Sequence, residues 1–138
     1  MRLPCKAFPV SDGPHVCSAR LNVSIALPYE NAPRTKRFDA IVDSGATRCV
    51  LNADIGRFIG LNIQSRKLEE TMGIDSMSKV YVHKVALYVP GGPINIKAGF
   101  MEGLRVPALL GMNGFFEHFI VKFEVNELAF EIDRVHRA

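Results

Sequence analysis

Short apolar runs, each closed by a turn-forming residue within a few positions, recur along most of this chain. Residues 79–89 and 94–100, for example, alternate apolar and polar side chains on either side of a Pro-Gly-Gly-Pro turn at residues 90–93. Alternation with a period of two is typical of a strand with one buried face. Further strands are expected at residues 16–27, 37–43, 49–51, 66–73, 119–123 and 128–132. Many short strands at this spacing predict an all-β closed sheet or barrel.

Helix signals are few. Asn52 can cap a helix over residues 53–59 that ends at Gly60, and a second short amphipathic stretch covers residues 115–119. The expected fold class is therefore all-β, with one or two short helices. The phenylalanines near the carboxyl end follow helix and then strand periods, so we expect them in the core: Phe115, Phe116, Phe119, Phe123 and Phe130.

The length of 138 residues, with 48% hydrophobic residues, is that of one domain with a sizeable core. Residues 1–15 contain Pro4, Pro9, Gly13 and Pro14, and we expect an irregular lead-in there. Residues 16–138 are expected to form a single domain. No internal repeat or low-complexity run divides it.

Charge and cysteine content limit the classes of partner. The formal net charge is +3, too weak and too dispersed for a typical nucleic-acid binder, so no nucleic-acid partner is expected. No apolar stretch is long enough for a signal peptide or a membrane span, so we expect no membrane association. The three cysteines (Cys5, Cys17 and Cys49) leave one unpaired in any disulfide scheme. Together these features favour a reducing compartment and a cytoplasmic location.

One carboxylate stands where an apolar strand meets a turn of small residues. Residues 38–42 run into Asp43, which is followed by Ser44, Gly45 and Ala46. An acid between apolar residues is costly unless it is hydrogen-bonded or shares its charge with another group. The small residues let another backbone or a ligand approach closely. A simpler interpretation is that Asp43 only caps a tight turn, because Asp-Ser-Gly is common turn chemistry.

A second apolar strand ends in glycine near the carboxyl end, in the sequence Leu109-Leu110-Gly111-Met112-Asn113. With the Asp-Ser-Gly-Ala sequence at residues 43–46, it resembles the signature of the retropepsin-like aspartic proteases, the single-lobed relatives of retroviral proteases. The order of elements follows that family from about residue 19 to residue 132. The resemblance implies a retropepsin-like closed barrel (the acid protease fold) and hydrolysis of peptide bonds. It also assigns Leu110, Gly111 and Asn113 to the family's second motif.

The resemblance implies a homodimer, because this chain has one copy of the Asp43 motif and the chemistry needs two carboxyl groups. Asp43 of each chain would act on one water molecule, with a polypeptide as substrate. Ser44 would accept a backbone hydrogen bond across the dimer axis. The Gly45 backbone would approach the carboxylate closely enough to donate to it, and Ala46 would leave space for substrate.

The hairpin over residues 66–89 takes the position of the family's flap, which closes over a bound peptide. Its expected tip, and the tentative substrate-binding segment, is Gly73, Ile74, Asp75, Ser76 and Met77. This tip has one glycine, whereas retroviral flaps are rich in glycine. A plain surface hairpin is the alternative interpretation. The sequence also has Thr47 and Met112 where retroviral members carry an Asp and an Arg that pair to brace the dimer.

No Cys/His spacing matches a zinc site, so we expect no metal and no cofactor. His83 alternates with apolar neighbours and is expected on the exposed face of its strand. Three hypotheses follow for the chain as a whole. It is an aspartic endopeptidase that acts as a homodimer, a non-catalytic module that binds peptides or proteins on the same fold, or a structural barrel in which Asp43 only orders a turn.

Overall fold

The computed structural model describes residues 1–10, 13–72 and 77–135. Strands dominate these residues, with one short α-helix, α1 (Ala53–Phe58), and the 3-10 turns η1 (Ile63–Ser65) and η2 (Val125–Glu127). The strands are β1 (Arg2–Pro4), β2 (Lys6–Val10), β3 (Gly13–Ser18), β4 (Arg20–Ala26), β5 (Phe38–Val42), β6 (Val50–Asn52), β7 (Leu68–Met72), β8 (Met77–Val89), β9 (Gly92–Met101), β10 (Ala108–Leu110), β11 (Phe119–Glu124) and β12 (Ala129–Arg134).

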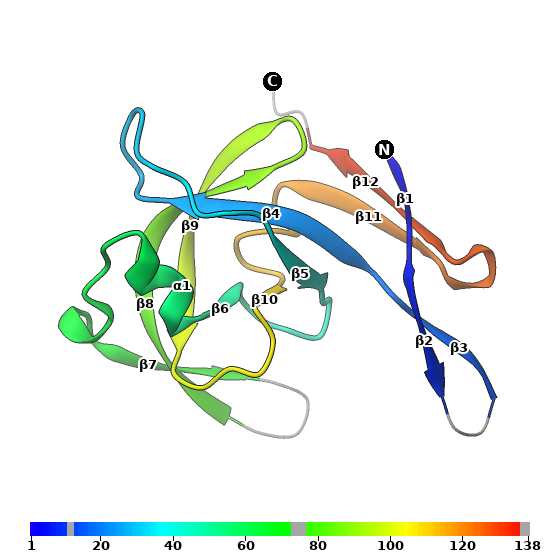
Figure 1. The fold of residues 1–138 in the computed structure, drawn as a ribbon, viewed down its shortest axis with the longest axis horizontal. Coiled ribbons are helices and arrows are strands. Elements are labelled where there is room, and N and C mark those ends of the chain that lie inside the picture. The colour runs from blue at the N-terminus through cyan, green and yellow to red at the C-terminus, as the bar shows by residue number, and fades with distance from the viewer. Residues whose placement is uncertain (11–12, 73–76, 136–138) are drawn as a thin grey trace.

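A closed barrel of six strands forms the centre of the molecule (Figure 1). The strand order is β4-β5-β10-β6-β9-β8, and β8 pairs with β4 to close the ring. The barrel is mixed, because β5 pairs with β10 and β6 with β9 in parallel while the other pairs are antiparallel. The strand β7 extends the sheet beside β8. The expected all-β barrel is therefore confirmed, with α1 as the one α-helix of the described residues.

The core lies inside the barrel and beneath α1. In β9, Ile94, Ile96 and Ala98 are buried while the residues between them are exposed, as the alternation predicts. Each fully buried large apolar side chain contributes roughly 1.5 to 3 kcal/mol to folding. The largest of the fully buried side chains are Phe100, Phe115, Phe130, Ile25, Leu51, Ile63, Leu87 and Leu110. The prediction for Phe123 is wrong: its side chain is 43% exposed, because it lines an open cavity together with residues of β3 and β5.

The predicted helix cap is confirmed. The Asn52 side chain accepts a hydrogen bond of 2.9 Å from the backbone N–H of Asp54, and α1 ends one residue before the expected position. The segment expected as one strand over residues 16–27 is two strands, β3 and β4, with Ala19 between them.

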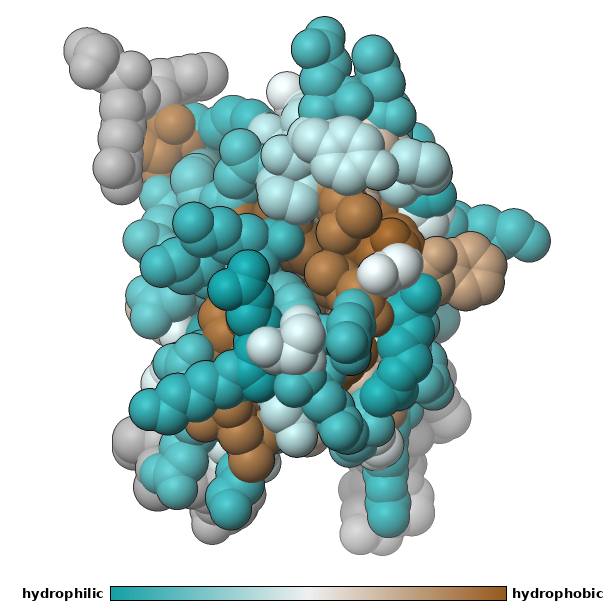
Figure 2. Space-filling model, turned by 90° about the vertical axis from the view of Figure 1, so that its left-hand side faces the viewer, coloured by the Kyte–Doolittle hydropathy of each residue, from teal (hydrophilic) through white to brown (hydrophobic). Residues whose placement is uncertain are grey.

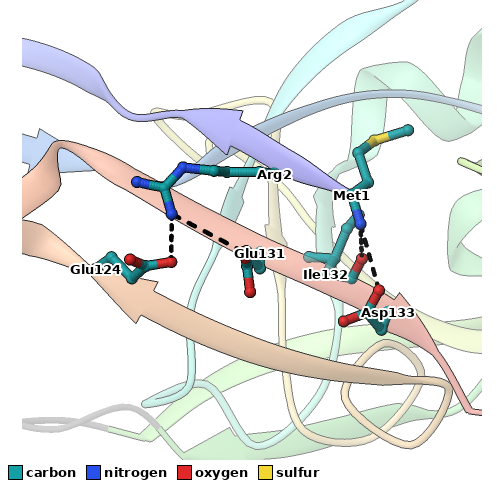
Figure 3. Close-up of polar contacts among 6 residues, drawn as sticks. All are labelled: Met1, Arg2, Glu124, Glu131, Ile132 and Asp133. Carbon is teal, nitrogen blue, oxygen red and sulfur yellow. Dashed lines mark hydrogen bonds and ion pairs between the residues drawn. The ribbon is translucent and has the colours of Figure 1, made fainter.

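The expectation of an irregular lead-in at residues 1–15 is wrong at the level of local structure. The strand β1 pairs with β12 from the other end of the chain, and β2 forms a hairpin with β3. The amino group of Met1 donates to the Ile132 carbonyl at 2.9 Å, and Arg2 contacts Glu124 at 2.6 Å and Glu131 at 3.9 Å (Figure 3). Prolines in this segment are tolerated because a strand with a free edge needs fewer N–H donors.

Cys5 and Cys17 form a disulfide that joins the segment after β1 to β3. The third cysteine, Cys49, is free and buried. One cysteine is thus unpaired, as the count requires, and with Cys5 and Cys17 bonded the odd count carries no argument for a reducing compartment.

Candidate active site

Asp43 lies at the end of β5, beside the end of β10. Val42 and Leu110 are paired in parallel, and the backbone N–H of Asp43 donates to the Leu110 carbonyl at 2.9 Å. Because parallel strands end on the same side of a sheet, Asp43 and Gly111 leave the barrel together. The structure thus brings together the two sequence motifs.

The residues after Asp43 form a tight turn. The Gly45 N–H donates to Asp43 Oδ1 at 2.9 Å, and the Ala46 N–H donates to the Asp43 carbonyl at 3.2 Å. The predicted approach of the Gly45 backbone to the carboxylate is therefore confirmed. The same bond is that of an Asx turn, so it also agrees with the turn-capping interpretation. Ser44 and Gly45 are exposed, whereas Ala46 is buried.

Backbone hydrogen bonds connect the residues after this turn to the second motif. The N–H of Met112 donates to the Ala46 carbonyl at 2.9 Å, and the N–H of Asn113 donates to the Thr47 carbonyl at 2.9 Å. The Cys49 N–H then donates to the Asn113 carbonyl at 3.0 Å. These backbone bonds hold the Asp43 loop and the Gly111 segment as one unit.

Gly111 is required by this close approach. A Cβ atom at Gly111 would lie 2.3 Å from the Arg48 carbonyl oxygen and 2.7 Å from the Ala46 carbonyl oxygen. Both contacts are with backbone, which cannot rotate away as a flexible side chain would. The glycine of the second motif therefore serves the packing of the Asp43 loop.

Cys49 anchors the same unit from inside. Burial raises the pKa of its thiol to about 12, and an opposing contribution comes from a hydrogen bond with the Gly111 backbone. A thiol that stays protonated is not a nucleophile at neutral pH. Cys49 is therefore a packing residue of this unit.

A cavity of about 330 Å³ opens beside Asp43. Among the described residues, no Lys, Arg or His side chain forms an ion pair with the Asp43 carboxylate. The cavity is lined by Cys17, Ser18, Ala19, Ile41, Val42, Asp43, Ser44, Phe123 and Val125. Phe123 and Val125, which sequence reasoning did not assign to the site, come from β11 and η2; only the fold brings them near residue 43.

The hairpin expected as a flap is present as the antiparallel pair β7–β8. Of the expected tip, Gly73, Ile74, Asp75 and Ser76 lie outside the described residues, and Met77 begins β8. The hairpin is joined to the Asp43 loop by a hydrogen bond of 3.2 Å between the hydroxyls of Thr47 and Thr71.

Met112 and Thr47 occupy the two positions where retroviral members carry the Arg and Asp that brace the dimer, and the two side chains do not replace that ion pair. The Met112 side chain is 48% exposed, and Thr47, at the other brace position, contacts β7 through its hydroxyl. His83 is buried, so the expectation of an exposed histidine is wrong. Its Nε2 donates to the Ile63 carbonyl at 2.8 Å, and its ring meets Phe100 edge-on at 5.7 Å.

The described residues contain no cluster of three or more His, Cys, Asp or Glu side chains able to hold a metal ion. Among the same residues, none of the helices has the length and hydrophobicity to cross a membrane. No protein-family model matches this chain, and a search of curated proteins finds no match.

Proposed function

We propose that this chain is an aspartic endopeptidase with a retropepsin-like barrel, in which Asp43 of two identical chains forms the catalytic pair. The observation that carries the proposal is the junction of the two motifs. Asp43 leaves β5 beside Gly111, and backbone hydrogen bonds join Ala46 to Met112. This unit holds a half-buried carboxylate beside an open cavity. An aspartate that only capped a turn would not need a cavity beside it.

The chemistry follows from two carboxyl groups that share one proton. Like charges a few ångström apart cannot both ionise, so one member of the pair stays protonated near the working pH. The ionised member takes a proton from a water molecule, which attacks the peptide carbonyl carbon, while the protonated member donates to the carbonyl oxygen. Within this scheme, the Gly45 N–H orients Asp43 through its bond to Oδ1.

The second chain would dock on the surface beside Asp43. We call it the β11 surface and define it by the exposed apolar side chains of Phe123 and Val125, which line the cavity beside Asp43. Exposed apolar groups of this kind mark interaction sites. The strand β11 pairs only with β12, so its other edge is open within the described residues. A second copy of this chain is the expected partner, because Asp43 lines the cavity next to this surface and the two-carboxyl chemistry needs an identical group.

This mode of dimerisation differs from the interleaved terminal strands of retroviral members. Here β1 pairs with β12 of its own chain, and Arg2 contacts Glu124 on β11 (Figure 3). The terminal strands thus form a three-stranded sheet, β1-β12-β11, within one chain. That sheet leaves the edge of β11 for the partner.

Replacement of Asp43 by Asn tests the catalytic assignment. The amide keeps the size and turn geometry of the carboxylate but cannot supply the acid–base pair. We expect Asp43→Asn to lose cleavage of unfolded polypeptides, read by mass spectrometry, while sedimentation still gives a dimer. Activity of the unchanged protein should be highest below neutral pH, because one carboxyl must keep its proton. Equal cleavage by Asp43→Asn would overturn the assignment.

Substitutions on the β11 surface test the dimer separately. Phe123→Asp places a charge beside Asp43 on an apolar surface and should give an inactive monomer. Phe58→Asp is the matched control, because Phe58 is 79% exposed on α1, away from β11. It should stay dimeric and active. A Phe123→Asp protein that remains a dimer, or a monomer that cleaves, contradicts the two-chain site.

The alternative is a binding module that holds peptides without cleaving them. It is favoured by the exposed Met112 and by the absence of an acidic residue at Thr47, since the retroviral brace depends on that pair. Peptide binding that is unchanged in Asp43→Asn, with no cleavage by either protein, would support this alternative.

A further inference from the structure

Four cationic side chains gather at a cavity of about 350 Å³ on the exposed face of β8 and β9, beside the start of β7. We call this group the basic tract, and it consists of Arg66, Lys67, Lys84 and Lys97. Glu69 and Val82 complete the lining of the cavity. Hydrophilic residues cover most of the face that carries β7 (Figure 2).

The basic tract carries an unusual cross-strand pair. Lys84 on β8 lies directly opposite Lys97 on β9, and both side chains are exposed. Like charges directly opposite each other destabilise a sheet. None of the four cations forms an ion pair with a described residue. The tract therefore concentrates positive charge without the neutralisation that a purely structural role would favour.

The tract adjoins the segment that follows the Asp43 turn. A second cavity, of about 480 Å³, shares Glu69, Val82 and Lys97 with the first and is also lined by Arg48. Arg48 follows the Asp43 turn, and its Nη2 lies 4.0 Å from Glu69 Oε1. The second cavity therefore connects the tract to Arg48, which lies five residues after Asp43 in the chain.

We propose that the basic tract binds an acidic segment of the polypeptide substrate, at a distance from the bond that is cut. This inference rests on the proposed function and adds a substrate preference to it. Lysine ammonium groups and an arginine guanidinium bind carboxylates well. The binding needs no covalent step, only exchange of bulk water and counterions for carboxylate contacts.

A polypeptide fits the tract better than a nucleic acid does. Glu69 lines the tract cavity and Glu117 lines the adjoining cavity, and both carboxylates repel a continuous phosphate backbone. The lining of the two cavities contains no Phe, Tyr or Trp on which bases could stack. A peptide with spaced carboxylates can contact the lysines and avoid Glu69.

The test measures binding in the full-length Asp43→Asn protein, so that cleavage cannot interfere. The probes are a fluorescent peptide of alternating Glu and Gly, its Gln counterpart, and single-stranded oligo-dT, each followed by anisotropy. The tract variant is Lys84→Glu/Lys97→Glu. The matched control is Lys36→Glu/Arg37→Glu, which changes the net charge equally at two exposed residues before β5.

We expect the Glu peptide to bind, with affinity that falls as salt rises, and the tract variant to bind it about tenfold more weakly. The control variant should stay within about twofold of the parent, as expected for a charge outside the tract. Equal loss in both variants, equal binding of the Gln peptide, or no binding of the Glu peptide would overturn the proposal. Tighter binding of oligo-dT than of the Glu peptide would overturn it in favour of a nucleic-acid surface.

The outcome is separable from the proposed function. If the tract variant binds as well as the parent while the unmutated chain still cleaves in an Asp43-dependent way, only the tract proposal fails. If the tract binds as expected but cleavage does not depend on Asp43, the catalytic proposal fails and with it the role of the tract in a protease.

Discussion

Substitution of Gly111 by Ala tests whether the two motifs form one unit. The added methyl group would lie 2.3 Å from the Arg48 carbonyl oxygen, where ordinary contact begins at 3.4 Å. The Arg48 segment and the Gly111 segment must therefore separate by about 1 Å. Both partners are backbone, so the strain falls on the Asp43 loop.

The expected cost has two parts. Overpacking of a buried contact costs about 1 to 3 kcal/mol. Separation of the segments also weakens the hydrogen bonds from Met112 to Ala46 and from Asn113 to Thr47, each 2.9 Å long and worth about 1 kcal/mol. The free energy of unfolding should therefore fall by about 3 to 5 kcal/mol.

Urea denaturation followed by circular dichroism measures this loss. With an m-value of about 2 kcal/mol per molar urea, the midpoint should fall by about 2 M. Gly103→Ala is the control, because Gly103 has φ of 71° and a Cβ there meets nothing within 4 Å. Its cost, about 1 kcal/mol, comes from the left-handed backbone alone.

Cleavage should disappear in Gly111→Ala even at urea-free conditions where the protein remains folded, because the loop that carries Asp43 has moved. The reasoning is refuted if Gly111→Ala costs no more stability than Gly103→Ala. It is equally refuted if the folded Gly111→Ala protein cleaves at the rate of the parent.

Three further predictions concern stability. Burial raises the pKa of the Cys49 thiol from 9.0 to about 12, so the thiol of the unfolded chain ionises first as the pH rises. The free energy of unfolding should therefore fall above pH 9, by about 1.4 kcal/mol at pH 10. Urea midpoints of Cys49→Ala, which lacks the thiol, should not show this fall. Cys5→Ser removes the disulfide with Cys17, which closes a loop with a sequence separation of 12. The free energy of unfolding should fall by about 3 kcal/mol, and reduction of the unmutated protein should give the same loss. Lys97→Glu replaces the repulsion with Lys84 by attraction and should raise stability by about 0.2 to 1 kcal/mol; a fall in the thermal midpoint would contradict it.

Local patterns predicted the elements that depend on neighbours in the sequence. The alternation in β9 and the cap at Asn52 are both confirmed, because each depends on contacts within a few residues. The predicted approach of the Gly45 backbone to Asp43 is confirmed for the same reason, since the two residues share one turn.

Features that depend on distant partners were missed or predicted wrongly. The strand β1 is stabilised by β12 from the other end of the chain, so residues 1–15 read as irregular on local criteria. His83 is buried because the Ile63 carbonyl and Phe100 meet it from other elements. Phe123 follows a core-like spacing, but it lines an open cavity beside residues of β3 and β5.

The amino-acid sequence determines by itself that strands predominate, and it supplies a lone acid on a small-residue turn together with a distant glycine. Those properties depend on side-chain period and residue size, which are local. Only the tertiary structure decides that Asp43 meets Gly111, that Phe123 lies beside the carboxylate, and that Lys84 faces Lys97. The physical reason is that strand pairing and barrel closure bring together residues far apart in the chain, and no local pattern encodes the partner.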